Sequence, residues 1–97
     1  MINKVKQVLR VSSNHFDDEI NDLIDAAKDD LIYSGVDEEK VKAEGELDPL
    51  ITRAIKTYCK AYFGYDNPDA DRFAKSYEML KIHLSLSTEY RGDNSEA

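Results

Sequence analysis

The chain has 97 residues and a net charge of −7, enough for one domain that buries only roughly two-thirds of its unfolded surface, a small core for a monomer. Its single cysteine, Cys59, excludes an intrachain disulfide and is typical of a reducing cytoplasm. The apolar runs are too short for the roughly 20 residues of a membrane span, and the start lacks the roughly 7–15-residue apolar stretch of a signal peptide.

The first predicted helix covers residues 2–10. Its apolar residues recur at spacings of three, three and one and line one face: Ile2, Val5, Val8 and Leu9. Three basic residues lie off this face: Lys4, Lys6 and Arg10. The run Ser12-Ser13-Asn14 is expected to end the helix, because these side chains compete for backbone hydrogen bonds.

The second predicted helix covers residues 16–34. Its apolar residues follow spacings of four, three, one, three and four: Phe16, Ile20, Leu23, Ile24, Ala27 and Leu31. Acidic residues fill its first turn, where the helix dipole favours negative charge: Asp17, Asp18 and Glu19. Gly35 is expected just past its C-terminus, with Val36 supplying the apolar contact of the C-terminal cap.

Residues 37–47 are mostly charged and predict an exposed connection. Val41 is the only large apolar residue inside it. Asp37 can cap one or two helical turns that run through Ala43 and end at Gly45.

Residues 48–86 predict an αα-hairpin against which the rest of the chain packs. Both of its helices have the same start signal, a short acceptor side chain at the N-cap followed by proline: Asp48-Pro49 and Asn67-Pro68. Between them, Gly64 can adopt the left-handed conformation that ends the first of the two helices.

The two hairpin helices differ in their apolar faces. The first has one wide face, which predicts the central helix of the fold: Leu50, Ile51, Ala54, Ile55, Tyr58, Ala61 and Tyr62. The second has a core face: Ala70, Phe73, Ala74, Tyr77, Leu80 and Leu84. It also has a second apolar stripe on another side: Met79, Ile82 and Leu86. Because a helix with two stripes usually has two partners, we expect this stripe to contact another chain or the N-terminal helix.

Together these elements predict an all-α fold, a small bundle of about four helices in one domain over residues 1–88. After Leu86 the only aromatic residue is Tyr90, and the polar composition offers it nothing to pack against. We therefore expect residues 89–97 to form a disordered tail that orders only on a partner.

Charge is unevenly distributed along the chain. Residues 17–48 hold thirteen acidic and three basic residues, whereas residues 49–86 hold four acidic and six basic ones. This asymmetry favours head-to-tail pairing between copies and disfavours a reader of duplex DNA, although acidic helices also serve solubility alone. With the second apolar stripe, it predicts a subunit interface that includes six residues: Met79, Ile82, Leu86, Asp17, Asp18 and Asp25.

Residues that could carry catalysis are few and isolated. His15 and His83 have no nucleophile at a recognisable spacing, and nothing near Cys59 in sequence would lower its pKa. Three aspartates lack the glycine and glutamate of a calcium loop and belong instead to a helix start: Asp66, Asp69 and Asp71. We therefore expect no enzymatic activity, no cofactor and no metal site.

The hairpin tyrosines leave a second function open. Four of them lie on or near the hairpin: Tyr58, Tyr62, Tyr65 and Tyr77. With Lys56, Lys60 and Arg72 they would suit a platform for single-stranded nucleic acid, although tyrosines at helical spacing more often belong to a core. The alternative function is therefore a small helical regulator that binds nucleic acid.

Several stretches, which together span roughly residues 1–88, carry a family resemblance. They are Asp17 to Ile20, Leu23 to Lys28, Leu31 with Ser34-Gly35-Val36, Asp48 to Ile55, Ser76 to Leu80, His83 to Ser85, and the distinctive turn Tyr62 to Pro68. In these residues the chain resembles the small head–tail connector (adaptor) proteins of tailed phages and of prophages in Gram-positive bacteria, also described as DNA-packaging proteins.

The resemblance implies an all-α structural subunit that assembles as a ring below the portal of the filled capsid. The ring extends the DNA channel and receives the next connector or tail component. Packaged DNA passes through the lumen without sequence-specific binding, which an acidic lumen favours. The expected location is the head–tail junction of the virion, and the bacterial cytoplasm during assembly, with no membrane or small-molecule partner. Residues 36–47 and the tail past Thr88 lie outside the resemblance, and there we expect partner-specific contacts.

Overall fold

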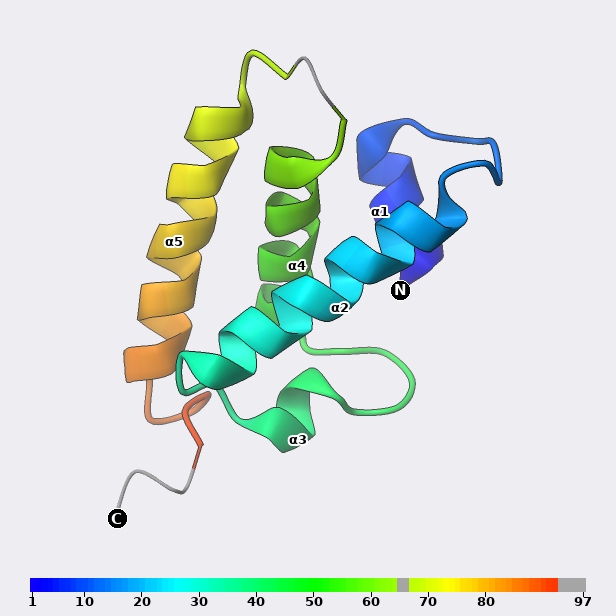
Figure 1. Cartoon of the computed structure of the whole chain (residues 1–97). Coiled ribbons are helices and arrows are strands. Elements are labelled where there is room, and N and C mark those ends of the chain that lie inside the picture. The colour runs from blue at the N-terminus through cyan, green and yellow to red at the C-terminus, as the bar shows by residue number, and fades with distance from the viewer. Residues whose placement is uncertain (65–66, 93–97) are drawn as a thin grey trace.

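The computed structural model describes residues 1–64 and 67–92, which form five α-helices (Figure 1). The helices are α1 (Ile2–Leu9), α2 (Asp17–Tyr33), α3 (Glu38–Val41), α4 (Pro49–Tyr62) and α5 (Ala70–Leu86). The predicted all-α class is confirmed: four of these helices match the predicted ones, and α3 is the short helical piece expected between them.

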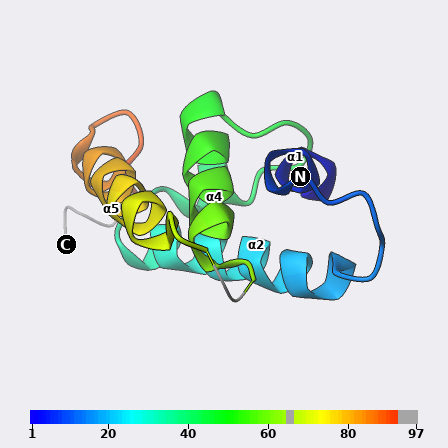
Figure 2. The same ribbon diagram turned by 90° about the horizontal axis from the view of Figure 1, so that it is seen from above.

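The centre of the fold is α4. It is crossed by α2 on one side and flanked by α1 and α5 (Figures 1 and 2). Its buried residues cover about half of the helix circumference at 3.6 residues per turn: Ile51, Thr52, Ala54, Ile55, Cys59 and Ala61. The predicted role of this helix as the central one is confirmed, because its wide face contacts three neighbours.

The other helices complete the core through part of the apolar faces that their sequences predict; on α5, Phe73 and Leu80 of the predicted core face instead line a surface groove. The buried residues are Val5 from α1, four residues of α2, and two of α5: Ile20, Ile24, Ala27, Leu31, Tyr77 and Leu84. Phe16, just before α2, remains 44% exposed but packs edge-on against Phe63, with 5.6 Å between ring centroids. The aromatic pair joins the start of α2 to the end of α4.

The connection between α2 and α4 is largely exposed, and its buried residues are Val36 and Val41. As predicted, Asp37 caps α3 by accepting the Glu39 N–H at 3.0 Å, and Val41 is fully buried. The helix ends at Val41, two residues before the predicted end at Ala43, because nothing after Val41 anchors another turn to the core. Gly45, with φ +83°, lies in the loop beyond it.

The first helix of the predicted hairpin begins as its sequence indicates. Asp48 accepts the Leu50 N–H at 2.8 Å, and Pro49 occupies the first turn, where no backbone N–H is needed. At the other end Gly64 has φ +86°, which confirms the predicted left-handed residue after the helix.

The second helix of the hairpin begins later than predicted. Asn67 and Pro68 form a turn, and α5 starts at Ala70 with Asp69 at its N-cap. The Asn67 side chain instead accepts the Asp69 N–H at 3.1 Å and donates to the Lys60 carbonyl at 2.6 Å. Asn67 therefore ties the start of the second helix to the last turn of the first, and the N-cap prediction for it is wrong.

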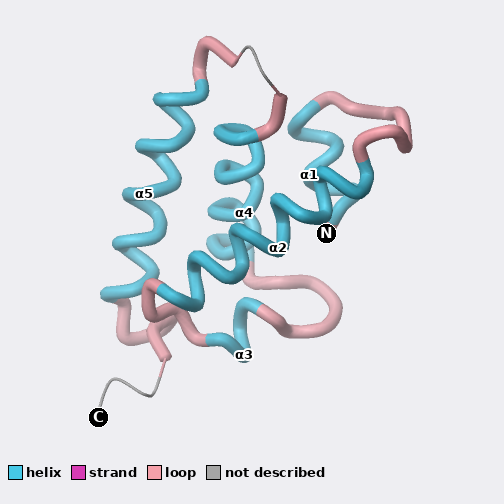
Figure 3. The backbone as a smooth tube through the Cα atoms, in the orientation of Figure 1, coloured by secondary structure: helices cyan, strands magenta, loops and turns pink. Residues whose placement is uncertain are grey.

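The segment after α5 turns back onto the bundle (Figure 3). Tyr90 is only 7% exposed and donates its phenol hydrogen to the Asp48 carboxylate, 3.0 Å from each oxygen. The Gly92 N–H donates to the Gly35 carbonyl at 2.8 Å. The expectation that Tyr90 has nothing to pack against is wrong, because Asp48 has acceptor capacity left after capping α4. The rest of the predicted tail, residues 93–97, lies outside the described residues.

Candidate functional site

The second apolar stripe of α5 lies on the surface of the protein. Met79, Ile82 and Leu86 are 72%, 54% and 72% exposed, whereas Leu84 on the same helix is fully buried. The N-terminal helix therefore does not cover this stripe in the described part of the chain, and the predicted contact of the stripe with that helix is wrong. We call these three residues the outer stripe.

The acidic residues predicted for the same interface lie elsewhere on the chain. Asp18 and Asp25 are exposed on α2, while Asp17 is half-buried and forms a 2.8 Å ion pair with Lys6 of α1. Met79, the first residue of the outer stripe, lines a hollow together with Val8 of α1 and with the side of α4 that carries Lys56, which we call the outer side of α4. Helix α2 crosses α4 on the opposite side (Figure 2). A contact that uses both sets of residues must therefore join one set from each of two copies.

A groove beside the outer stripe was not predicted as a site. It is a hollow of about 640 Å³ lined by α4, α1 and α5: Arg53, Lys56, Thr57, Lys60, Val8, Phe73, Ser76, Met79, Leu80 and His83. Its base is the outer side of α4, with three basic residues at spacings of three and four. The spacing of those residues, opposite the apolar face of α4, is the sequence signal that could have revealed it.

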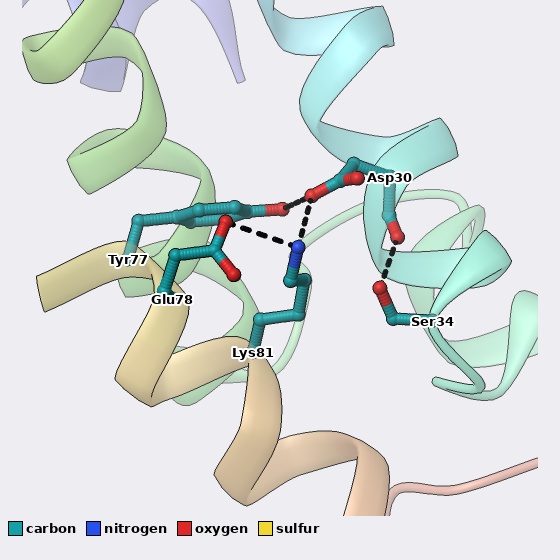
Figure 4. Close-up of polar contacts among 5 residues, drawn as sticks. All are labelled: Asp30, Ser34, Tyr77, Glu78 and Lys81. Carbon is teal, nitrogen blue, oxygen red and sulfur yellow. Dashed lines mark hydrogen bonds and ion pairs between the residues drawn. The ribbon is translucent and has the colours of Figure 1, made fainter. Parts of the chain in front are cut away.

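A polar network holds α5 against α2 (Figure 4). Asp30 of α2 accepts a hydrogen bond from the Tyr77 hydroxyl at 2.6 Å and another from Lys81 at 3.1 Å. Lys81 also pairs with Glu78 at 3.1 Å, and Ser34 bonds to the Asp30 carbonyl at 2.8 Å. The network joins α2 to α5, because Asp30 of α2 accepts from both Tyr77 and Lys81 of α5.

The environment of this network shifts two pKa values. Burial, together with the hydrogen bond to Asp30, raises the pKa of the Tyr77 hydroxyl well above its ordinary value. Burial alone would lower the pKa of Lys81, but the hydrogen bonds to Asp30 and Glu78 outweigh it and raise that pKa. Both groups are therefore held in their protonated forms at neutral pH.

The candidate catalytic groups remain isolated in the structure. Cys59 is fully buried, and burial raises the pKa of its thiol to about 12. His15 and His83 are both exposed. Within residues 1–64 and 67–92, no three His, Cys, Asp or Glu side chains form a possible metal site; Asp66, part of the calcium alternative, lies outside that range. No helix in the same ranges is long and apolar enough to cross a bilayer.

The tyrosine platform considered for nucleic acid does not form from the described residues. Tyr58 packs between Tyr62 and Tyr77, with ring centroids at 4.7 and 5.0 Å, and Tyr77 is buried. Lys56 and Lys60 each precede one of the α4 tyrosines by two residues, which places them roughly 160° away around the helix. The rings and the basic groups therefore lie on different faces. Tyr65 falls in the part of the chain that is not described.

Comparisons with known proteins identify a family. A family model described as "Phage connector protein" matches residues 1–91. Searches of curated proteins and of solved structures gave no significant match. The matched range contains all five described helices and Tyr90, so it covers the whole bundle on which the outer stripe and the groove lie. The chain therefore belongs to the phage connector protein family, as its resemblance to head–tail connectors predicted.

Proposed function

We propose that this connector protein is a head–tail adaptor of a tailed phage or prophage. It forms a ring below the portal, extends the DNA channel and joins the capsid to the next connector or tail component. The observation that carries the proposal is the outer stripe, an apolar surface left open on a protein whose family connects phage parts.

The outer stripe supports assembly on energetic grounds. Burying a side chain such as Leu, Ile or Met contributes roughly 1.5–3 kcal/mol relative to leaving it in water. In the isolated chain most of this stabilisation is absent for the outer stripe, because more than half of each residue is exposed: Met79, Ile82 and Leu86. A neighbouring subunit recovers it. We place Asp17, Asp18 and Asp25 of α2 in the same subunit contact, on the partner's side.

Charge supports a passive relation to DNA. The chain carries a net charge of −7, so a ring of copies repels the phosphate backbone and lets packaged DNA slide through its lumen. The adaptor has no chemical step to perform, and its partners are the portal, the next connector or tail protein, and copies of itself.

The first test is the mass of the protein in solution as a function of concentration, alone and with its cognate portal. A closed oligomer, formed alone or only when the portal is added, supports the adaptor. A strict monomer or dimer that ignores the portal contradicts it. Retention on duplex DNA with a steep salt dependence would support the nucleic-acid-binding regulator instead.

The second test is the Ile82→Asp variant. Placing a charge in the middle of the outer stripe is expected to abolish assembly, because a carboxylate buried in an apolar contact is strongly unfavourable. The helical content measured by circular dichroism is expected to stay unchanged, since the side chain is 54% exposed. Asn3→Asp, which adds the same charge at an exposed position in the first turn of α1, is the control for the added charge and should assemble. Normal assembly of Ile82→Asp would remove the stripe from the interface.

A further inference from the structure

The exposed side of α2 carries a narrow acidic stripe. Its four aspartates recur at spacings of four, three and four, so they lie one above another along the helix: Asp18, Asp22, Asp25 and Asp29. All four are exposed, and none has an ion-pair partner within the described ranges. Tyr33 follows at the next spacing of four and is 93% exposed, so the stripe ends in a free aromatic ring.

The groove on the outer side of α4 has the opposite charge. Arg53, Lys56 and Lys60 run along its base, and the recorded ion pairs of the described chain include none of them. Its walls are largely apolar, with Val8 on the α1 side and Phe73 and Leu80 on the α5 side. A groove of this kind fits an amphipathic helix that presents acidic groups.

Charge and apolar character follow the same order along both surfaces. Since α4 and α5 form an antiparallel hairpin, Lys60 lies near the start of α5, with its amine 4.6 Å from the Phe73 ring centre. The outer stripe runs toward the other end of α5, because Met79 lines the groove and Ile82 and Leu86 follow it along the helix. On α2 the aspartates come first and Tyr33 last. A helix α2 laid antiparallel to α4, and therefore parallel to α5, would set carboxylates on basic groups and Tyr33 on the outer stripe.

We propose that the groove between α1, α4 and α5 receives α2 of a second copy of this chain. A chain cannot fill its own groove, because its α2 is packed across the opposite side of α4 (Figure 2). The contact is therefore head-to-tail: each copy offers a groove to one neighbour and α2 to another, which builds a ring if the rotation closes. This inference rests on the proposed function and names the surfaces that join its subunits.

Nucleic acid is the competing occupant of the groove. Three basic residues in a row would also attract a phosphate backbone. The apolar walls and Tyr33 have no role in such contact, whereas both are used when α2 of a second copy binds. The net charge of −7 further opposes DNA at this small surface.

Paired charge reversals test the contact. The acid-reversed variant carries Asp22→Lys and Asp25→Lys, and the groove-reversed variant carries Arg53→Glu and Lys56→Glu. Each alone places like charges together at its two reversed positions and is expected to self-associate at least roughly tenfold more weakly than the unaltered chain. Mixed together, they restore opposite charges and are expected to bind each other. Glu39→Lys with Glu44→Lys, an equal charge change on exposed residues outside α2, is the matched control.

The decisive measurement is an NMR titration of the ¹⁵N-labelled acid-reversed variant with the unlabelled groove-reversed variant. Amide shifts confined to the groove and to the reversed stripe support the proposal, and they should weaken as salt is added. Absence of shifts at millimolar concentration, with both variants helical by circular dichroism, overturns it. Groove shifts that appear only with a short DNA duplex also overturn it, in favour of nucleic acid.

Assembly on the portal separates this inference from the proposed function. If the unaltered chain forms rings with the portal and both reversed variants do so equally well, the adaptor stands and the groove contact is wrong. If the unaltered chain does not assemble with the portal, the adaptor fails, while the titration still decides whether α2 binds the groove. A Tyr33→Ala variant that weakens the mixed pair roughly tenfold would support the predicted position of the ring on the outer stripe.

Discussion

The two apolar faces of α5 differ in solvent exposure, because one is buried in the core and the other lies on the surface. On the inner face, Tyr77 and Leu84 are buried, with no more than 1% of either residue exposed. On the outer face, two of the three apolar side chains are 72% exposed. Both faces follow helical spacing in the same 17-residue helix, so apolar periodicity alone does not separate them.

The difference lies in the polar groups beside each face. The inner face brings Tyr77 and Lys81 to Asp30, a residue 47 positions away in the sequence from Tyr77, and that directional contact fixes α5 on α2. The outer face has no such contact among the described residues. An apolar stripe thus predicts a packing partner, and polar contacts at the border of the stripe indicate whether that partner is another helix of the same chain or a different molecule.

The largest expected effect comes from the same substitution on either face. Leu84→Ala should lower the free energy of unfolding by about 2–5 kcal/mol, because it removes buried methyl groups and leaves a cavity. Leu86→Ala, two residues on, should change it by less than about 0.5 kcal/mol. Urea denaturation of both variants measures the difference. Equal losses would mean that the outer stripe is covered within the monomer, and the comparison between the faces would fail.

A smaller effect is expected from the polar contact at the inner face. Tyr77→Phe keeps the ring but removes the hydroxyl that donates to Asp30 at 2.6 Å, which should reduce stability by about 1–3 kcal/mol. Tyr33→Phe is the matched control and should be close to neutral, because the Tyr33 side chain is 93% exposed. Thermal denaturation followed by circular dichroism compares them. Two neutral variants would show that the hydrogen bond does not fix α5.

Much of the fold is predictable because its helices are local. Apolar spacing and caps place α1, α2 and α4 within a residue or two, since each signal lies inside or next to the helix it defines. The misses depend on distant partners. The local sequence predicts Asn67 as an N-cap, but the Asn67 side-chain amide donates a hydrogen bond to the Lys60 carbonyl. The local sequence predicts Tyr90 as part of a tail, but its hydroxyl donates a hydrogen bond to Asp48, which lies 42 residues earlier in the chain.

The candidate site divides in the same way. The outer stripe is predictable from three residues on one helix, because its spacing is visible in the sequence. The groove is not, because its lining comes from α1, α4 and α5, and only the fold brings Val8 beside Met79 and Lys56. The acidic stripe of α2 could be read from spacing alone, yet its proposed partner surface could not.

The smallest expected effect distinguishes the two faces by pH. Groups packed inside the bundle, among them Tyr77, Lys81 and Cys59, have raised pKa values, so the folded chain holds protons that the unfolded chain releases in alkali. Stability is therefore fully present below the unfolded pKa values and falls as the pH rises above them. Cys59 acts first, since its thiol pKa rises from 9.0 to about 12.

Between pH 9 and 10, Cys59→Ala should therefore lose less stability than the unaltered chain, by up to about 1.4 kcal/mol per pH unit, the value of one proton. The readout is the slope of the unfolding free energy against pH, which is independent of any constant loss from the smaller side chain. Leu86→Ala, with its change on the outer face, should keep the slope of the unaltered chain. If Cys59→Ala kept it too, the Cys59 thiol would titrate as freely in the folded chain as in the unfolded one, and the inner side of the bundle would be open to solvent.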